Sequence, residues 1–275
     1  MNEFLTIVSQ PAVCGLLQFL IVIPVAVGLL LFLIPDKYIT FKGILALLTS
    51  LLACYLTFTL FSSATLMTSL GNDVIKGCLS IFGIDFAQDA ARYSTFAIDN
   101  LSKLMIAFAS LFAFLIILYS IVYIKIRRVR NYYSWFLITL GCSLGALLSD
   151  NLLLFLTFWG ILGITLYKLI PGSDEESSAT AKKTLILIGA SDSIMIIGIS
   201  IIWWLTGSLS MNNISIPTDS VIAVTAFITL LVGSFTKAGA FPFHTWFPDY
   251  TMNAPASSSA LLPASLDKLL GIYFL

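Results

Sequence analysis

The sequence predicts an all-α membrane protein, a polytopic helical bundle that crosses the bilayer many times. Hydrophobic residues make up 59% of the 275 residues and charged residues only 10%, and the mean hydropathy is +1.00. A water-soluble domain of this length would carry far more charge on its surface. The formal net charge is zero, so nothing in the composition indicates a nucleic-acid-binding protein.

The apolar residues fall into eight runs, most of them close to the roughly 20 residues that a transmembrane helix needs. All should be helical, because the bilayer interior has no water to satisfy unpaired backbone groups. The first run is too long for a signal peptide and follows no basic segment, so we expect it to be the first transmembrane helix. The runs are 13–34, 43–61, 104–124, 134–148, 152–169, 185–205, 221–235 and one that begins near Ser257 and is still apolar at Leu275.

Lysine and arginine concentrate in alternate links, those after the first, third and fifth runs. Cytoplasmic links are the ones enriched in these residues. The opposite links contain little more than Lys76 and Arg92. We therefore expect a multi-pass protein of the inner (cytoplasmic) membrane with its N-terminus outside. The basic residues of the cytoplasmic links are Lys37, Lys42, Lys125, Arg127, Arg128, Arg130, Lys182 and Lys183.

These runs divide the chain into four parts. Residues 1–70 contain the first two helices, and 71–100 an external segment in which the alternation of apolar residues predicts a short hairpin or an amphipathic stretch. Residues 101–130 contain the third helix, and 131–275 contain helices four to eight. The chain stops within an apolar helix at Leu275. This ending predicts either a fragment of a longer protein or a helix whose packing another subunit completes.

Five ionisable residues in or beside the predicted helices are the candidates for function. A charge at the centre of a transmembrane helix costs about 2.5–3.5 kcal/mol on insertion scales, so such residues are functional candidates by default. We expect them to take part in ion or proton translocation rather than in bond chemistry. They are Asp192, Lys237, His244, Asp267 and Lys268.

Lys237 ends the seventh run and precedes Pro242. Proline removes a backbone donor, which predicts a break or kink shortly after the lysine. Transporters place ion sites at broken helices, where irregular backbone lines a wet cavity. Burial disfavours the charged ammonium, so Lys237 could gain and lose protons near neutral pH. The alternative is a permanent salt bridge to Asp267 or Asp192 that only orders the helices.

The other candidates allow two interpretations each. His244 could be a proton relay, because imidazole takes both protonation states near neutral pH, or an interfacial hydrogen-bonding residue beside Trp246. Asp267 and Lys268 are neighbours and point in different directions on a helix, so one could face the lysine of the seventh helix and the other a partner subunit. Asp192 lies among small residues that permit close helix packing, which supports a structural role as well as a functional one.

A dense motif begins at Lys237: a lysine and small residues, then P-x-H-x-W-x-P-D, then A-P-x-x-x-S-A-L-L. It resembles the antiporter-like subunits shared by respiratory complex I, energy-converting membrane-bound hydrogenases and Mrp-type sodium/proton antiporters. Weaker similarity extends upstream through the third, fifth and sixth helices and covers nearly the whole chain. The matching residues of the motif are Lys237, Pro242, His244, Trp246, Pro248, Asp249, Ala254, Pro255, Ser259, Ala260, Leu261 and Leu262.

The resemblance implies a longer fold with two inverted repeats, each containing a broken helix, of which this chain holds the first three helices and most of the first repeat. Two residues depart from the family pattern. Gly160 stands where the family has a glutamate, directly after Phe158 and Trp159, and Pro263 stands where it often has a histidine. Either Asp192 or Asp267 replaces the glutamate, or this module no longer pumps. Pro263 indicates the hydrogenase-related branch.

The resemblance favours an ion-translocating subunit of a redox-driven complex, moving protons or exchanging sodium for protons beside other membrane-arm subunits. Electrons and iron–sulfur clusters would belong to partner subunits of the oxidoreductase. The chain itself is expected to bind no cofactor and no metal, because its four cysteines are scattered singly and form no C-x-x-C pair. They are Cys14, Cys54, Cys78 and Cys142.

Three other functions stay open on the sequence. One is a subunit of an Mrp-type Na+/H+ antiporter, which would lie among small hydrophobic subunits without iron. Another is a coupling subunit for inorganic-carbon uptake with a soluble zinc-containing partner. The last is a degenerate structural spacer, for which the missing glutamate at Gly160 is the main argument.

Overall fold

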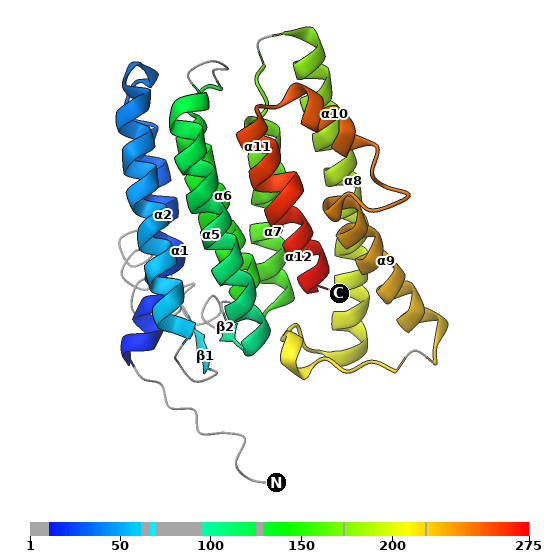
Figure 1. The fold of residues 1–275 in the computed structure, drawn as a ribbon. Helices are drawn as coiled ribbons and strands as arrows, with labels where there is room; N and C mark the ends of the chain where they lie inside the picture. The colour runs from blue at the N-terminus through cyan, green and yellow to red at the C-terminus, as the bar shows by residue number, and fades with distance from the viewer. Residues whose placement is uncertain are drawn as a thin grey trace, which may run out of the picture.

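The computed structural model of the chain describes residues 11–61, 66–69, 95–124, 129–172, 174–217 and 219–274. It is a bundle of long helices that run side by side (Figure 1). The long helices are α1 (Pro11–Leu31), α2 (Ile39–Phe61), α5 (Asn100–Tyr123), α6 (Tyr132–Leu148), α7 (Leu152–Lys168), α8 (Glu175–Thr206) and α9 (Val221–Ala238). Shorter elements are η1 (Asp36–Tyr38), η2 (Met211–Asn213), α10 (Trp246–Asn253), α11 (Ala256–Leu261), η3 (Leu262–Leu266) and α12 (Asp267–Phe274).

The first seven apolar runs of the sequence each form one helix, as predicted. Within the described residues, four segments are long and apolar enough to cross a membrane: Asp36–Phe61, Asn100–Tyr123, Glu175–Thr206 and Val221–Ala238. Leu16–Leu31, Tyr132–Leu148 and Leu152–Lys168 are apolar but shorter. The predicted eighth helix is present as one run of helix in which α11 and α12 are joined by the π-helical turn η3.

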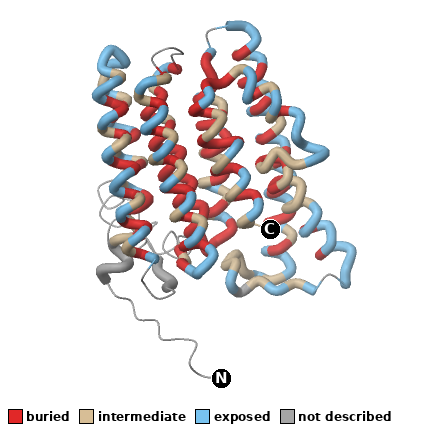
Figure 2. The backbone as a smooth tube through the Cα atoms, viewed as in Figure 1, coloured by how far each residue is buried: buried red, intermediate tan, exposed pale blue. Residues whose placement is uncertain are grey.

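Helix α6 is the centre of the bundle. All of its residues except Trp135 are buried, and it packs against α1, α5 and α7. The outward faces of the surrounding helices are exposed and apolar (Figure 2). Phe58 is 76% exposed, Val122 75% and Trp204 70%. Apolar side chains exposed over whole helices are typical of surfaces that face lipid.

The predicted external segment, residues 71–100, lies mostly outside the described residues. Two short strands flank it, β1 (Leu66–Ser69) and β2 (Thr95–Ile98), which pair antiparallel with Leu66 opposite Ile98. Phe96 and Ile98 of β2 are buried. The residues on either side of the part that is not described are therefore paired with each other, and β2 packs into the bundle.

Helix α12 lies close against α9 because Gly271 has no side chain. An ideal Cβ at this position would come 2.9 Å from Ala238 Cβ and 3.0 Å from the Ser234 carbonyl oxygen. Gly271 follows Asp267 by about one helical turn, so this contact places Asp267 against the end of α9. The close approach of the two helices thus positions a candidate site residue.

Replacing Gly271 with valine is expected to lower the free energy of unfolding by roughly 1–3 kcal/mol, because added methyl groups overpack a close contact. Thermal unfolding of the detergent-purified protein, followed by tryptophan fluorescence, measures the change. Gly189→Val is the matched control, since nothing lies within 4 Å of a Cβ at Gly189. Equal melting temperatures for the two variants would contradict close packing at Gly271.

Candidate functional site

The helix that carries Lys237 ends at the next residue, Ala238. Gly239 adopts a left-handed conformation with φ 66°. Its N–H donates to the Thr236 carbonyl at 3.1 Å, and the Ala240 N–H donates to the Phe235 carbonyl at 2.8 Å. This is the glycine-terminated helix end of the Schellman type. The predicted break is present. Gly239 causes it, three residues before Pro242, the residue from which the break was predicted.

The Lys237 side chain is completely buried. Its Nζ donates to the Trp159 carbonyl oxygen of α7 at 2.6 Å, and it lies 4.4 Å from the centroid of the Trp159 ring. The ring face attracts the ammonium electrostatically. The same tryptophan donates from Nε1 to Asp192 Oδ1 of α8 at 2.7 Å. Trp159 therefore links the lysine to one of the two candidate carboxylates.

Asp267 is also completely buried. Neither of its carboxylate oxygens has a hydrogen-bond partner among the described residues. Together with Asp192, it is one of two carboxylates whose charge acts on the Lys237 ammonium. A buried polar group without a partner is rare and needs an explanation. At this place its oxygens are free to accept a proton, a cation or water.

The sequence alternative of a permanent salt bridge from Lys237 to Asp192 or Asp267 is wrong for the described structure. Over the part of the chain that is described, the ion pairs within 4.0 Å are Lys42–Asp36 and Lys183–Asp249. The Lys237 ammonium instead uses its short hydrogen bond to a backbone carbonyl. Because the lysine is not locked to either carboxylate, its electrostatic interaction with them can change with their charge.

Asp267 owes its position to the irregular turn that precedes it. Pro263 lies within η3 and has no N–H to donate to the preceding turn. The helix widens there into a single π-helical turn, and Ser265 Oγ donates to the Ala260 carbonyl oxygen at 2.6 Å. Single π-turns are frequent at functional sites. The departure from the family pattern at Pro263 therefore accompanies a local change of helix geometry beside the buried carboxylate.

The structure does not bring His244 and Lys268 into this cluster. Both are exposed. The His244 ring lies 5.8 Å from the Phe241 ring, centroid to centroid, and Lys268 Nζ lies 4.9 Å from the centroid of Phe247. As expected for neighbours on a helix, Asp267 points inward and Lys268 does not. The predicted translocation roles of His244 and Lys268 stay predictions without a place in the buried cluster.

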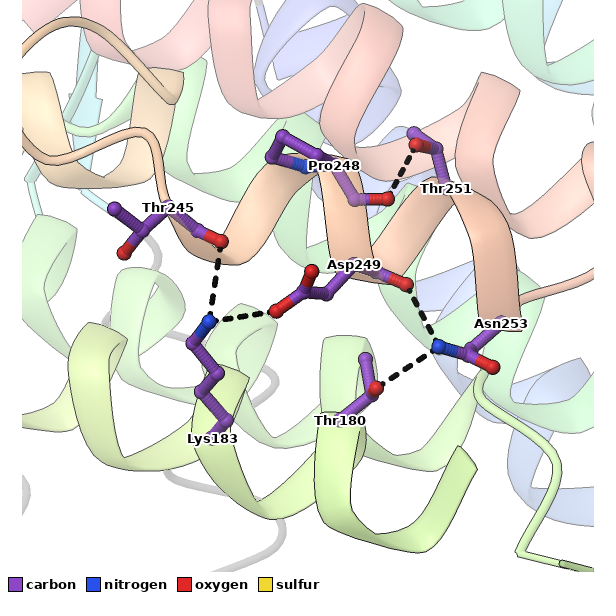
Figure 3. A network of polar contacts seen from close by, with 7 residues as sticks. All are labelled: Thr180, Lys183, Thr245, Pro248, Asp249, Thr251 and Asn253. Carbon is purple, nitrogen blue, oxygen red and sulfur yellow. Dashed lines mark hydrogen bonds and ion pairs between the residues drawn. The ribbon is translucent and has the colours of Figure 1, made fainter. Parts of the chain in front are cut away.

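The segment after the break is attached to α8 (Figure 3). Lys183 Nζ forms an ion pair with Asp249 Oδ2 at 2.6 Å and donates to the Thr245 carbonyl at 3.4 Å. Asn253 Nδ2 donates to Thr180 Oγ1 at 3.0 Å. On the buried side, Trp246 Nε1 donates to the Thr236 carbonyl at 2.8 Å. These contacts hold the start and end of α10 against the neighbouring helices.

Replacing Asp249 with asparagine is expected to lower the free energy of unfolding by less than about 1 kcal/mol, because ion pairs between exposed side chains contribute little. The two side chains are 43% and 45% exposed. A double-mutant cycle with Lys183→Met, followed by thermal unfolding, gives the coupling energy. A loss well above this range would mean that the pair is more important to the attachment of α10 than its exposure suggests.

The described chain also buries hydroxyl side chains that the sequence interpretation did not single out. Those without a protein hydrogen-bond partner are Tyr132, Ser134, Ser143, Thr184, Ser234, Ser257 and Ser259. Buried polar groups without protein partners are the usual ligands of internal water. Trp159 was also missed as a site residue. The only sequence signal for it is its place directly before the missing glutamate.

Comparison with known proteins identifies the family. Residues 149–275, which include α7 to α12 and therefore the whole buried cluster, match the model of the NADH:quinone oxidoreductase/Mrp antiporter transmembrane family. The chain belongs to this antiporter-like family. It is accordingly an integral, multi-pass membrane protein.

Curated relatives of this family member are antiporter subunits. A Na+/H+ antiporter subunit of Alkalihalophilus pseudofirmus is 34% identical over 187 residues, covering 65% of this chain and 23% of the relative. A Na+/H+ antiporter subunit of Staphylococcus haemolyticus is 30% identical over 268 residues, covering 94% of this chain and 32% of the relative. The chain thus spans about a third or less of the length of these antiporter subunits.

Solved structures share the fold of the antiporter-like chain. The Mrp complex from a Dietzia species gives a TM-score of 0.77 at 18% identity, covering 94% of this chain and 27% of that one. An archaeal membrane-bound sulfane sulfur reductase gives 0.74 at 22%, covering 94% and 40%. Respiratory complex I from Thermus thermophilus gives 0.70 at 21%, covering 95% and 52%. All three are multisubunit membrane complexes.

Gly160, which stands in place of the family glutamate, has open space around its Cα. Nothing lies within 4 Å of an ideal Cβ at Gly160. Asp192 instead approaches α7 from α8 beside Gly163, where an ideal Cβ would lie 3.8 Å from Asp192 Oδ2. No three His, Cys, Asp or Glu side chains gather as metal ligands in the residues described. The site consists of a lysine and two carboxylates.

Proposed function

We propose that this chain translocates ions through Lys237 as an antiporter-like subunit of Mrp type, exchanging sodium for protons. The observation that carries the proposal is the buried Lys237 ammonium at the end of α9, hydrogen-bonded to the Trp159 carbonyl and acted on by Asp192 and Asp267. A cation in this position at a helix break is the arrangement that transporters use for ion sites.

Electrostatic coupling supplies the exchange. A charged carboxylate near Lys237 stabilises the proton on its ammonium. When a proton or a sodium ion reaches Asp267 or Asp192 and cancels that charge, the ammonium loses the interaction and releases its proton more readily. Binding of one ion at a carboxylate therefore favours departure of another from the lysine. Internal water beside the buried hydroxyls would connect these groups.

The Mrp-type function replaces the redox-driven complex as the preferred proposal. Both curated relatives compared above are Na+/H+ antiporter subunits, whereas the likeness to complex I and to the sulfane sulfur reductase is one of fold. The hydrogenase-related branch indicated by Pro263 stays a prediction. Because the chain spans only part of its relatives, the remainder of the ion path would lie on further residues or on partner subunits.

Orientation follows from the basic links. The helix ends that are consecutive in sequence, those of α1 and α2, of α5 and α6, and of α7 and α8, lie at one end of the bundle (Figure 1). Lys37 belongs to η1 between α1 and α2, and Arg130 directly precedes α6. We place this end in the cytoplasm by the enrichment of Lys and Arg in cytoplasmic links. The N-terminus of α1 would then face outward.

The test is sodium/proton exchange in everted vesicles from cells that lack their own antiporters and express the complete assembly containing this chain. We expect sodium to dissipate a preformed pH gradient. We also expect the purified assembly to contain fewer than one iron atom per copy of this chain. An iron-rich assembly that takes up protons only with ferredoxin or quinone would overturn the proposal in favour of a redox-driven complex. No ion movement in either assay would support the structural spacer.

A further inference from the structure

A pocket of about 340 Å³ opens at the basic end of the bundle, between the ends of α1, α6, α7 and α8. This volume lies in the range of roughly 300–1,000 Å³ that small-molecule sites occupy. Arg130 and Lys168 bring two positive charges to its lining, and Ser178 brings a hydroxyl. The lining thus combines cationic and hydroxyl groups at one end of a membrane-spanning bundle.

Neither cation of this pocket is neutralised within the described chain. The ion pairs found there involve Lys42 and Lys183, whereas Lys168 Nζ lies 5.1 Å from the centroid of the neighbouring Tyr167 ring. Both Arg130 and Lys168 are exposed. Of the acidic residues at this end of the bundle, Asp174 accepts a hydrogen bond from the Ser177 N–H at 2.7 Å and caps α8, and Asp36 pairs with Lys42 at 2.7 Å. Two cations therefore remain available for an anion.

The pocket lining is also rich in aromatic rings. Phe32, Trp135 and Tyr167 line it, and the first two rings meet edge to face, with centroids 5.1 Å apart. Trp135 is the one residue of α6 that is not buried. Tryptophan and tyrosine at helix ends mark the level of the lipid headgroups. The pocket is therefore at the depth of the lipid headgroups, where the phosphate of a phospholipid adjoins its acyl chains.

We propose that this pocket binds the phosphate headgroup of an anionic phospholipid, with Arg130 and Lys168 on the phosphate and the three aromatic rings beside the glycerol and upper acyl chains. Basic pockets between transmembrane helices recognise such headgroups. The aromatic lining favours a lipid over free phosphate, which would leave those rings uncovered. The site would bind the ends of α1, α6, α7 and α8 together, independently of ion transport through Lys237.

The test uses the full chain in its assembly, stripped of lipid in detergent and titrated with phosphatidylglycerol while native mass spectrometry counts retained lipid. We expect one phosphatidylglycerol per chain, and binding at least about tenfold weaker in the double variant Arg130→Gln/Lys168→Gln. Lys182→Gln is the matched control, because Lys182 is a basic, exposed residue of α8 outside the pocket. It should bind as the unmodified protein does.

Phosphatidylcholine and inorganic phosphate distinguish the chemistry. Phosphatidylcholine should be retained at least about tenfold more weakly, since it carries no net charge for the two cations. Equal retention of both lipids, or equal binding by the double variant and the Lys182→Gln control, would overturn the proposal. Displacement of phosphatidylglycerol by millimolar phosphate would overturn it too, because it would identify a free-phosphate site.

Discussion

Replacing Lys237 with methionine is expected to reduce ion exchange at least about a hundredfold, the lower range of what one positioned proton-transfer group contributes. Methionine keeps an unbranched side chain of similar length but has no proton to exchange. The side chain is fully buried, and its Nζ makes the hydrogen bond to the Trp159 carbonyl. Sodium-dependent collapse of a pH gradient in everted vesicles measures the rate, and immunodetection of the assembly measures its abundance.

Two further variants separate proton exchange from a fixed charge. Lys237→Arg keeps the positive charge, but a guanidinium does not lose its proton in proteins. We expect this variant to be as inactive as Lys237→Met. Lys182→Met removes an exposed lysine outside the cluster and should transport normally. If Lys237→Arg transported at the full rate, Lys237 would act as a fixed structural cation and the exchange mechanism would be wrong.

The helices were predictable because the bilayer restricts the chain to few solutions. An apolar run of sufficient length must be helical in lipid, and the first seven runs are. The same reasoning found Lys237, Asp192 and Asp267, since a charge within an apolar run is conspicuous. Of the five candidates, these three lie in one buried cluster, and two of them are completely buried.

What the sequence did not reveal depends on packing between distant segments. Trp159 is one apolar residue in an apolar run, and its two contacts exist only because α8 and α9 approach α7 on the side of its ring. The end of α9 was assigned to Pro242 because proline is the stronger signal, whereas Gly239 acts earlier in the chain. The π-helical turn at Pro263 within the eighth helix likewise needed coordinates.

Burial also decided between alternatives that spacing left equal. Asp267 and Lys268 were equivalent candidates as neighbours, and the π-helical turn before Asp267 together with the packing of Gly271 against α9 places the aspartate inward. His244 shares the motif with Lys237 but lies on the exposed linker. A family motif therefore identifies the segment that contains a site better than it identifies which side chains of that segment meet.

Asparagine at Asp267 is expected to reduce ion exchange at least about tenfold, and asparagine at Asp192 to reduce it less. Asp267 is completely buried and lacks any hydrogen-bond partner among the described residues, so no protein hydrogen bond there competes with the moving ions for its oxygens. Asp192 is already held by Trp159 Nε1 at 2.7 Å. The amide oxygen of asparagine can also accept that hydrogen bond, so the contact with Trp159 survives the change.

The same vesicle assay, with Asp219→Asn as an exposed control in the link before α9, ranks the two carboxylates. A larger loss at Asp192 than at Asp267 would transfer the role of the missing glutamate to Asp192, the carboxylate that contacts Trp159. Full activity in both variants would mean that neither replaces it and that Lys237 exchanges protons without a carboxylate partner in this chain. The predicted order requires that the transported ion reaches Asp267, the carboxylate without a protein hydrogen bond among the described residues. At Asp192 a proton or sodium ion would compete with the Trp159 N–H, whereas at Asp267 it meets no competing donor.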